Sequence, residues 1–341
     1  MAKKNNLYLP KGYLNIPEIS KMADKSGAAF IVILGARQVG KTFGVLQHML
    51  REDRRFILMR RTKTEADFIA HGQITPFAGI DRSVFIKKAS EYHSTIYRRI
   101  DDETDEPIGI TLSLSTVSKI RGFSGADYTD LVFDEFIPES HVMKIKNEGD
   151  AFLNAVVTIS GNREIEDKPP LRTWLLANSN NLASPILAAL NLTEKIEQMS
   201  ASGQELSVMP ERGVVVVLPR SEQILAARKQ TALMRAINKE SSFSKMAFEN
   251  KFSYNDGSNV RSCNLKEFRY LASVAGMFAL YKHKAGGRLY CTNAQITGTY
   301  RREELQRFMR ELPDVKPYYI ANRIWFSSQV VKERFLEFMK I

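Results

Sequence analysis

The stretch Gly35-Ala36-Arg37-Gln38-Val39-Gly40-Lys41-Thr42 decides the fold of this chain. It fits the pattern G-x-x-x-x-G-K-[ST], follows the apolar run 30–34 and opens a helical pattern at 41–51, which is the context that a phosphate-binding loop requires. In such a loop the backbone N–H groups turn toward the phosphates, Lys41 reaches the outer phosphates, and Thr42 offers its hydroxyl to Mg²⁺. The stretch therefore predicts an ATP and Mg²⁺ site. Its residues would be Gly35, Arg37, Gln38, Val39, Gly40, Lys41 and Thr42.

A pair of carboxylates supplies the second half of the predicted site. Asp134 and Glu135 come directly after the apolar run 131–133. A carboxylate there can hold the magnesium ion together with Thr42, and a second one can take a proton from the attacking water. An acidic helix cap after a strand is the alternative reading of this segment. Beside a phosphate loop, the pair favours hydrolysis over transfer to a small acceptor.

Other apolar runs lie at 55–59, 171–177 and 214–218, and helical patterns lie near 64–71, 147–159 and 184–199. Strands that alternate with helices indicate a mainly parallel sheet covered on both faces. Residues 93–100 and 110–115 read as a hairpin inserted into this pattern, with its turn at Pro107 and Gly109. The sequence thus predicts an α/β fold, a P-loop NTPase of the ASCE type, over residues 1–220.

The sequence pattern changes after Pro219. Residues 221–260 are helical and polar and are expected to form a linker. Beyond them we expect a small α+β domain over 261–341, with a hairpin around Ala285, Gly286 and Gly287, two amphipathic helices and a strand at 318–325.

The length and composition agree with two folded domains: 341 residues are 44% hydrophobic and 26% charged. The net charge of +11 is uneven, because residues 1–220 hold 28 basic and 27 acidic side chains whereas residues 221–341 hold 21 and 11. A basic second part suggests contact with a polyanion such as nucleic acid, and a solubilising surface is the alternative.

Several classes of protein are disfavoured. Two cysteines, Cys263 and Cys291, are too few for a disulfide framework or a cysteine-rich metal site. No apolar stretch is long enough for a membrane helix, and the amino end lacks the apolar core of a secretory signal, so we expect a cytoplasmic protein without membrane contact.

Hydrolysis coupled to motion needs residues that sense the γ-phosphate. Asn178 ends a predicted strand and can do so with its side-chain amide, although an ordinary polar turn explains it equally well. An arginine can neutralise charge in the transition state, in cis or from a neighbouring subunit. The candidates are Arg37, Arg121 and Arg163, and a surface ion pair is the alternative role for each.

These motifs together resemble a known family. ARQVGKT (36–42) and SKIRGFSGADYTDLVFDEF (118–136) resemble the phosphate loop and acidic strand of large terminases and viral DNA-packaging ATPases. FILMRRTK (56–63), NRE (162–164) and LANSNN (176–181), in this order, look most like the small phi29-like phage packaging ATPases. The resemblance continues through residues 268–294 and so covers most of the chain.

The resemblance implies a homo-oligomeric ring, in the family a pentamer, that sits on the portal of a preformed procapsid in the host cytoplasm and drives double-stranded DNA inward with ATP. Carried over to this chain, Lys41, Glu135, Asn178 and Arg163 would be catalytic, with Arg163 favoured over Arg37 and Arg121 as the trans-acting arginine. Asp134 and Thr42 would hold the metal. Lys63 would face the DNA channel or the neighbouring subunit.

The second domain resembles the RNase H-like nuclease module of terminases, but its strands lack the clustered carboxylates that two-metal cleavage needs. We therefore expect a nuclease-silent module. The resemblance to the phi29-like group implies that this module binds nucleic acid, including a structural packaging RNA. Its candidate phosphate contacts, interleaved with Phe252, Tyr254, Tyr281 and Tyr290, are Arg261, Lys282, Lys284, Arg288, Arg301 and Arg302. Buried aromatic and exposed charged residues of an ordinary domain would give the same pattern.

Two other functions remain open from the sequence. A P-loop kinase for a small acceptor would phosphorylate a product, and it would leave the basic second domain without a role. A non-enzymatic nucleic-acid-binding scaffold would carry a degenerate pocket, which the intact Lys41, Asp134 and Glu135 disfavour.

Overall fold

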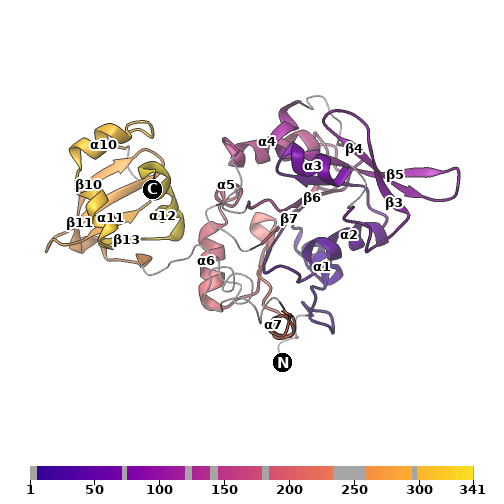
Figure 1. Cartoon of the computed structure of the whole chain (residues 1–341), viewed down its shortest axis with the longest axis horizontal. Coiled ribbons are helices and arrows are strands. Elements are labelled where there is room, and N and C mark those ends of the chain that lie inside the picture. Colours follow the sequence, from indigo (N-terminus) through magenta and orange to yellow (C-terminus); the bar gives the residue numbers. More distant parts are fainter. Residues whose placement is uncertain are drawn as a thin grey trace. The chain divides into compact units, whose positions relative to one another are not determined.

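The computed structural model describes residues 6–70, 75–119, 125–138, 145–178, 184–232, 259–293 and 298–340. Contacts within the chain divide it into two compact units, Met1–Ser253 and Tyr254–Ile341 (Figure 1). Most of the linker predicted at 221–260 lies outside the described residues, so the domain boundaries stay a prediction.

Among the described residues of the first unit, nine strands form one sheet in the order β3-β4-β5-β2-β6-β7-β1-β9-β8. Its centre is parallel, as predicted, and its edges are antiparallel. The parallel strands are β5 (Asp105–Ser113), β2 (Phe56–Arg60), β6 (Asp130–Asp134), β7 (Arg172–Ala177), β1 (Phe30–Leu34) and β9 (Val214–Val217). The edge strands are β3 (Val84–Lys88), β4 (Ser94–Arg99) and β8 (Leu206–Met209).

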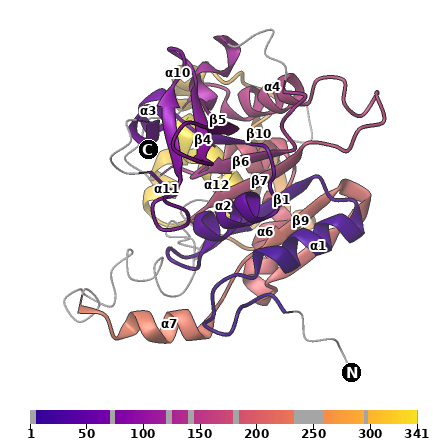
Figure 2. The same cartoon turned by 90° about the vertical axis from the view of Figure 1, so that its right-hand side faces the viewer.

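Both faces of this sheet are buried, which explains why its central strands read as continuous apolar runs. Alternate residues of the parallel strands enter two separate cores. Helices α1 (Ile16–Ser26), α2 (Lys41–Arg51) and α3 (Lys63–Ala70) pack on one face, where α1 and α2 lie side by side (Figure 2). Helices α4 (Glu148–Ser160), α5 (Pro185–Ala189) and α6 (Thr193–Ser202) pack on the other.

The inserted hairpin is present, but its predicted turn is wrong. Strands β4 and β5 pair from Arg99 and Asp105 onward, so the turn lies before Pro107 and Gly109, which are inside β5. Pro107 lies where β5 pairs with β4 and not with β2, at a sheet edge that tolerates proline. Gly109 permits close approach of β2, since a Cβ there would lie 2.5 Å from the carbonyl oxygen of Phe56.

The helix predicted at 184–199 is interrupted. It consists of α5 and α6, and Asn191 between them has a positive φ of 50°, a left-handed conformation that asparagine tolerates better than most residues. Helix α7 (Glu222–Lys229) follows β9 and is capped by Ser221, whose hydroxyl accepts a hydrogen bond from the N–H of Ile224. Within the described part of the chain, no helix is both long and apolar enough to cross a membrane.

The second unit is the small α+β domain that the sequence predicts. Its described strands are β10 (Phe268–Val274), β11 (Phe278–His283), β12 (Leu289–Thr292) and β13 (Ile324–Phe326), paired in that order. The first three form an antiparallel meander, and β13 runs parallel to β12. The turn around Ala285, Gly286 and Gly287 joins β11 to β12, as predicted.

Helices α10 (Leu305–Glu311), α11 (Val315–Ile320) and α12 (Gln329–Met339) pack on one face of this second sheet (Figure 1). The strand predicted at 318–325 is wrong in its first part, because residues 318–320 belong to α11 and β13 begins only at Ile324. A turn with Asn322 in the left-handed conformation separates the two elements.

Candidate functional site

The phosphate loop joins β1 to α2, as the sequence predicts. Gln38 and Gly40 have positive φ angles of 63° and 86°, and α2 begins at Lys41. Gly35 lies against Pro219, because a Cβ there would be 2.5 Å from the Pro219 Cγ atom. Glycine therefore suits the loop at Gly35, where Pro219 leaves no room for a side chain, and at Gly40, where φ is positive. The amino terminus of α2 points into the site.

Lys41 is the buried cation of the site, with 8% of its surface exposed. Its Nζ donates hydrogen bonds to the carbonyl oxygens of Gly35 and Ala36, at 2.9 and 2.8 Å, and to Asn178 Oδ1 at 3.1 Å. Burial lowers the pKa of the Lys41 ammonium to about 8, and the carboxylate of Asp134 opposes this shift. The partners are neutral, so the loop holds a buried positive charge that an anion would stabilise.

Asp134 lies opposite the phosphate loop at the end of β6. Its Oδ1 accepts hydrogen bonds from Thr42 Oγ1 at 2.8 Å and from the backbone N–H of Glu135 at 3.1 Å. Glu135 itself has a positive φ of 55°, which is unusual for a residue with a long side chain. The two predicted halves of the site thus meet through the Thr42 and Asp134 side chains.

Arg60 is a site residue that the sequence analysis did not single out. It ends β2, next to β6 in the sheet, and its guanidinium bridges both carboxylates, with 3.0 Å to Asp134 Oδ2 and 2.9 Å to Glu135 Oε2. The arginine side chain is 14% exposed and that of Glu135 is 62% exposed. The available signal was an arginine at the end of an apolar run whose strand neighbours the acidic one.

A pocket of about 280 Å³ opens between these elements. Most of the predicted nucleotide-site residues line it. Gly35 and Val39 do not, and Val39 is buried in an apolar core. The lining comprises Arg37, Gln38, Gly40, Lys41, Thr42, Phe43, Asp134, Glu135, Ala177 and Asn178. Asn178 comes from the end of β7, which lies between β1 and β6, so it occupies the middle of the site.

Helix α7 adds a cation beside the phosphate loop. The Arg228 Nε donates a hydrogen bond to Gln38 Oε1 at 3.3 Å. Burial, and then the charge of Arg37, lower the pKa of Arg228, and both arginines also act to lower the pKa of Lys41. Three positive charges therefore share this end of the pocket, an arrangement typical of a site for a multiply charged anion.

The three arginines proposed to act in the transition state differ in their surroundings. Arg37 is exposed in the loop. Arg163 is buried, and its Nη2 donates to the carbonyl oxygens of Ala126 and Tyr128 at 3.1 and 2.8 Å, so a trans-acting role would require release from these contacts. Arg121 lies outside the described residues.

The predicted nucleic-acid contacts fall into separate groups. Lys63, on α3, forms an ion pair of 2.6 Å with Asp67, and this hydrogen bond raises its pKa. In the second unit, Arg261 and Arg288 lie over the Trp325 ring, Lys282 is on β11, and Lys284 is in the turn after it. Arg301 and Arg302 precede α10. Phe252 and Tyr254 lie outside the described residues.

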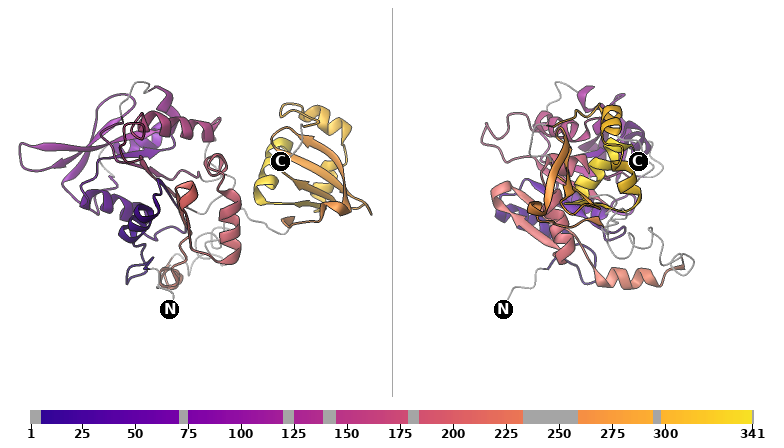
Figure 3. Two further views of the ribbon diagram at one scale, coloured as in Figure 1. Left: turned by 180° about the vertical axis from the view of Figure 1, so that it is seen from behind. Right: turned by 90° about the vertical axis from the view of Figure 1, so that its left-hand side faces the viewer.

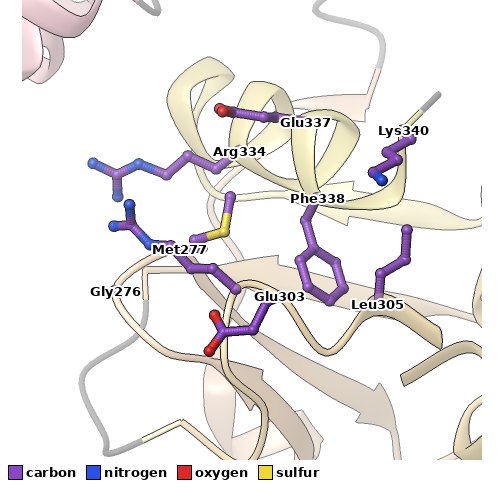
Figure 4. A pocket seen from close by; sticks show the side chains of 9 residues that line it. Gly276, Met277, Glu303, Leu305, Arg334, Glu337, Phe338 and Lys340 are labelled. Carbon is purple, nitrogen blue, oxygen red and sulfur yellow. The ribbon is translucent and has the colours of Figure 1, made fainter. Parts of the chain in front are cut away.

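Arg302 lines a second pocket, of about 320 Å³, together with Gly276 and Met277 (Figure 4). Its charged lining is mixed, with Arg334 and Lys340 beside Glu303 and Glu337. Across the described ranges, no group of three or more His, Cys, Asp and Glu side chains could hold a metal ion.

The parallel sheet, the phosphate loop between β1 and α2, and the carboxylates at the end of the non-adjacent strand β6 define the fold of a P-loop NTPase of the ASCE type. A profile of the family described as podovirus DNA encapsidation protein (Gp16) matches residues 20–295. The chain belongs to this family, which confirms the resemblance read from its motifs.

Two solved structures are similar along almost the whole chain. "The bacteriophage Phi-29 viral genome packaging motor assembly" matches with a TM-score of 0.63 and 18% identity, covering 98% of this chain and 99% of that one. "The Phi-28 gp11 DNA packaging Motor" matches with a TM-score of 0.57 and 16% identity, covering 99% of each chain. At such identities the likeness shows the fold, and it confirms the predicted fold class. A comparison with curated proteins found no match.

Proposed function

We propose that this chain is the ATP-hydrolysing subunit of a ring that translocates double-stranded viral DNA into a preformed procapsid. The observation that carries the proposal is the meeting of Lys41, Thr42, Asp134, Glu135 and Asn178 around one pocket. Membership of the encapsidation family and the names of the structurally similar motors support the viral and DNA-packaging part.

The pocket fits the triphosphate of ATP. Lys41 satisfies its ammonium with carbonyl oxygens of its own loop and with Asn178, so phosphate oxygens can replace these partners without leaving the charge unpaired. The N–H groups at the start of α2 and the nearby Arg37 and Arg228 add positive potential. The chain would thereby bind and orient the outer phosphates.

Thr42 and Asp134 would hold the magnesium ion. Their oxygens are 2.8 Å apart in a direct hydrogen bond, and hydroxyl and carboxylate oxygens are the ligands that Mg²⁺ prefers. A bound Mg²⁺ would neutralise charge that develops on the transferred phosphoryl group.

Glu135 would orient the attacking water and accept its proton at a carboxylate oxygen. In this structure that carboxylate is engaged by Arg60, so it can act as a base only after the ion pair opens. Contact with DNA or a neighbouring subunit would favour the open form, with Asn178 sensing the γ-phosphate and Arg163 contributing from the next subunit.

The remaining partners follow from the family resemblance and the basic second unit. We propose a homo-oligomeric ring, a pentamer, bound to the portal of the procapsid in the host cytoplasm. The second unit would bind nucleic acid, including a structural packaging RNA, without nuclease activity. Lys63 would contact DNA or the neighbouring subunit.

Phosphate release by the full chain tests the proposal. Turnover should rise with long duplex DNA; Lys41→Ala should abolish it, and Glu135→Gln should keep ATP binding while losing turnover. The exposed Glu52 offers a matched control, since Glu52→Gln changes the same chemistry outside the pocket. Turnover that is indifferent to DNA would contradict the motor, and a phosphorylated small product would favour a kinase.

A further inference from the structure

The second sheet has two faces of different character. One face packs against α10, α11 and α12 through apolar residues such as Leu280, Cys291 and Phe326. The left panel of Figure 3 views this unit from the opposite side to Figure 1. Because side chains alternate along a strand, the neighbours of these core residues point to the other face.

An aromatic residue occupies the same position on all four strands of that other face. Tyr270 is paired with Tyr281, Tyr281 with Tyr290, and Tyr290 with Trp325. Neighbouring strands lie about 4.8 Å apart, so the residues form one continuous row across the sheet. Tyr270 and Tyr281 have ring centroids 5.7 Å apart.

This aromatic row, Tyr270–Tyr281–Tyr290–Trp325, is partly open to solvent. Tyr270 is 43% exposed, Tyr281 and Trp325 are intermediate, and Tyr290 is buried at 4%. The hydroxyl of Tyr270 is hydrogen-bonded to Ser273 and Thr299 at 2.8 and 2.9 Å, which fixes its ring. Folding buries most apolar rings, so the accessible rings of Tyr270, Tyr281 and Trp325 on one sheet face indicate a binding surface.

The side chains around one end of the row are positively charged. The guanidinium carbons of Arg261 and Arg288 lie 4.4 and 4.2 Å from the centroid of the Trp325 ring. The strands β10, β11, β12 and β13 contain no Asp or Glu. The face therefore offers flat π surfaces together with planar cations, which themselves stack on bases and contact phosphates.

We propose that this face binds unpaired nucleotides of a nucleic acid, with bases stacked on Tyr270, Tyr281 and the Trp325–arginine cluster and with phosphates near Arg261 and Arg288. Duplex DNA does not fit this chemistry, because its bases are stacked on each other and present only their edges. A sheet with exposed aromatic residues is suited to splayed bases. The inference refines the nucleic-acid role proposed above for the second unit and rests on it.

Binding of the full chain to labelled oligonucleotides of about 12 units tests this proposal. The ligands are an unstructured RNA, the same sequence as single-stranded DNA, its duplex, and an abasic strand with the same number of phosphates. Both single strands with bases should bind more tightly than the abasic strand. The duplex can also bind the first unit in the proposed motor, so its affinity should not depend on Tyr270 and Tyr281. The comparison of RNA with DNA identifies which source is preferred.

Tyr281→Leu and Tyr270→Leu should each weaken binding of the unpaired strands by about 5- to 100-fold, the range for loss of one stacked base. Tyr281→Phe keeps the ring and should retain most of the affinity. Phe68→Leu removes an aromatic side chain that is 61% exposed on the first unit and should leave affinity unchanged.

Intrinsic fluorescence gives a second readout. The chain has two tryptophans, and Trp174 is fully buried, so quenching by the unpaired strands should come from Trp325 and disappear in Trp325→Phe. This signal is measured on the unsubstituted chain and on Trp325→Phe, so it does not depend on whether a leucine variant folds. Equal affinity for the abasic strand and the strands with bases, or quenching that survives Trp325→Phe, would overturn the proposal. An absence of ATP turnover in the same preparations would instead contradict the proposed motor. The binding experiment would still show whether the face takes unpaired nucleotides.

Discussion

Arg60 forms ion pairs with both site carboxylates, and its replacement has two separate effects, one on Glu135 and one on Asp134. Arg60→Met keeps the apolar stem and removes the guanidinium. In the ion pair of Arg60 with Glu135, the carboxylate is 62% exposed. Losing this pair frees Glu135 and lowers the unfolding free energy by only about 0.2–1 kcal/mol. If the pair restrains Glu135 as a base, turnover without DNA should rise by up to about fivefold.

The pair with Asp134 is different, because both side chains are largely buried, at 14% and 5% exposure. Removing one member of such a pair costs about 3–5 kcal/mol. Asp134 keeps the hydroxyl of Thr42 and the N–H of Glu135 as donors, which places the expected loss of unfolding free energy near the lower end, about 3 kcal/mol. Mg²⁺ with ATP should reduce this loss, since the ion would replace the missing positive charge.

The assay is phosphate release with and without duplex DNA, combined with thermal unfolding with and without Mg²⁺ and ATP. Arg98→Met is the matched control: Arg98 pairs at 2.9 Å with Asp53, whose side chain is 77% exposed, away from the pocket. It should lower stability without raising DNA-free turnover. If Arg60→Met leaves DNA-free turnover unchanged, or abolishes it at full stability, the restraint of Glu135 by Arg60 is refuted.

Three further predictions concern Lys41, Asn178 and Arg163. Because burial lowers the pKa of Lys41 from 10.5 to about 8, ATP affinity measured by titration should fall above pH 8, by up to about tenfold per pH unit. The unfolding free energy of the nucleotide-free chain, relative to that of Lys41→Met, should instead rise between pH 8 and 10.5, where the unfolded lysine binds more protons. If ATP affinity and unfolding free energy changed in the same direction with pH, the lowered pKa of Lys41 would be contradicted. Asn178→Ala removes the 3.1 Å partner of Lys41 and should reduce kcat by about tenfold with a smaller change in KM, and a change in KM alone would limit Asn178 to binding. Arg163→Ala leaves two carbonyl oxygens without their donor and should cost about 2–3 kcal/mol of unfolding free energy. If Arg163 also acts across a subunit boundary, mixing Arg163→Ala with Lys41→Ala chains should restore turnover, and mixtures that stay inactive would argue for a purely structural role.

The sequence predicted the central sheet well, and it predicted most of the residues that line the pocket at the end of β1 and β6, because both depend on short-range patterns. A strand buried on both faces needs a continuous apolar run, and a phosphate loop needs its glycines and lysine at fixed spacing. Asp134 and Glu135 were found for the same reason, since polar side chains directly after a buried strand lie at the carboxyl edge of a parallel sheet, where ligands bind.

The errors share another cause, which is contact between distant segments. Pro107 and Gly109 are typical turn residues, yet the pairing of β5 with β4 and β2 places them inside a strand. Arg60 and Arg61 look alike in sequence. They diverge because Arg60 faces the ends of β6, whereas Arg61 is buried in an ion pair of 2.5 Å with Glu148 at the start of α4. Neither environment can be read from local spacing.

The strand order itself explains why the site has a central amide. Strand β7 lies between β1, which leads to Lys41, and β6, which ends at Asp134, so the residue after β7 must lie between the cation and the carboxylates. A charged side chain at that position would pair with one of them and disturb the other. Asn178 instead donates and accepts hydrogen bonds without adding charge. In the proposed function, Asn178 would therefore respond to the loss of the γ-phosphate from Lys41 without changing the net charge around Lys41, Asp134 and Glu135.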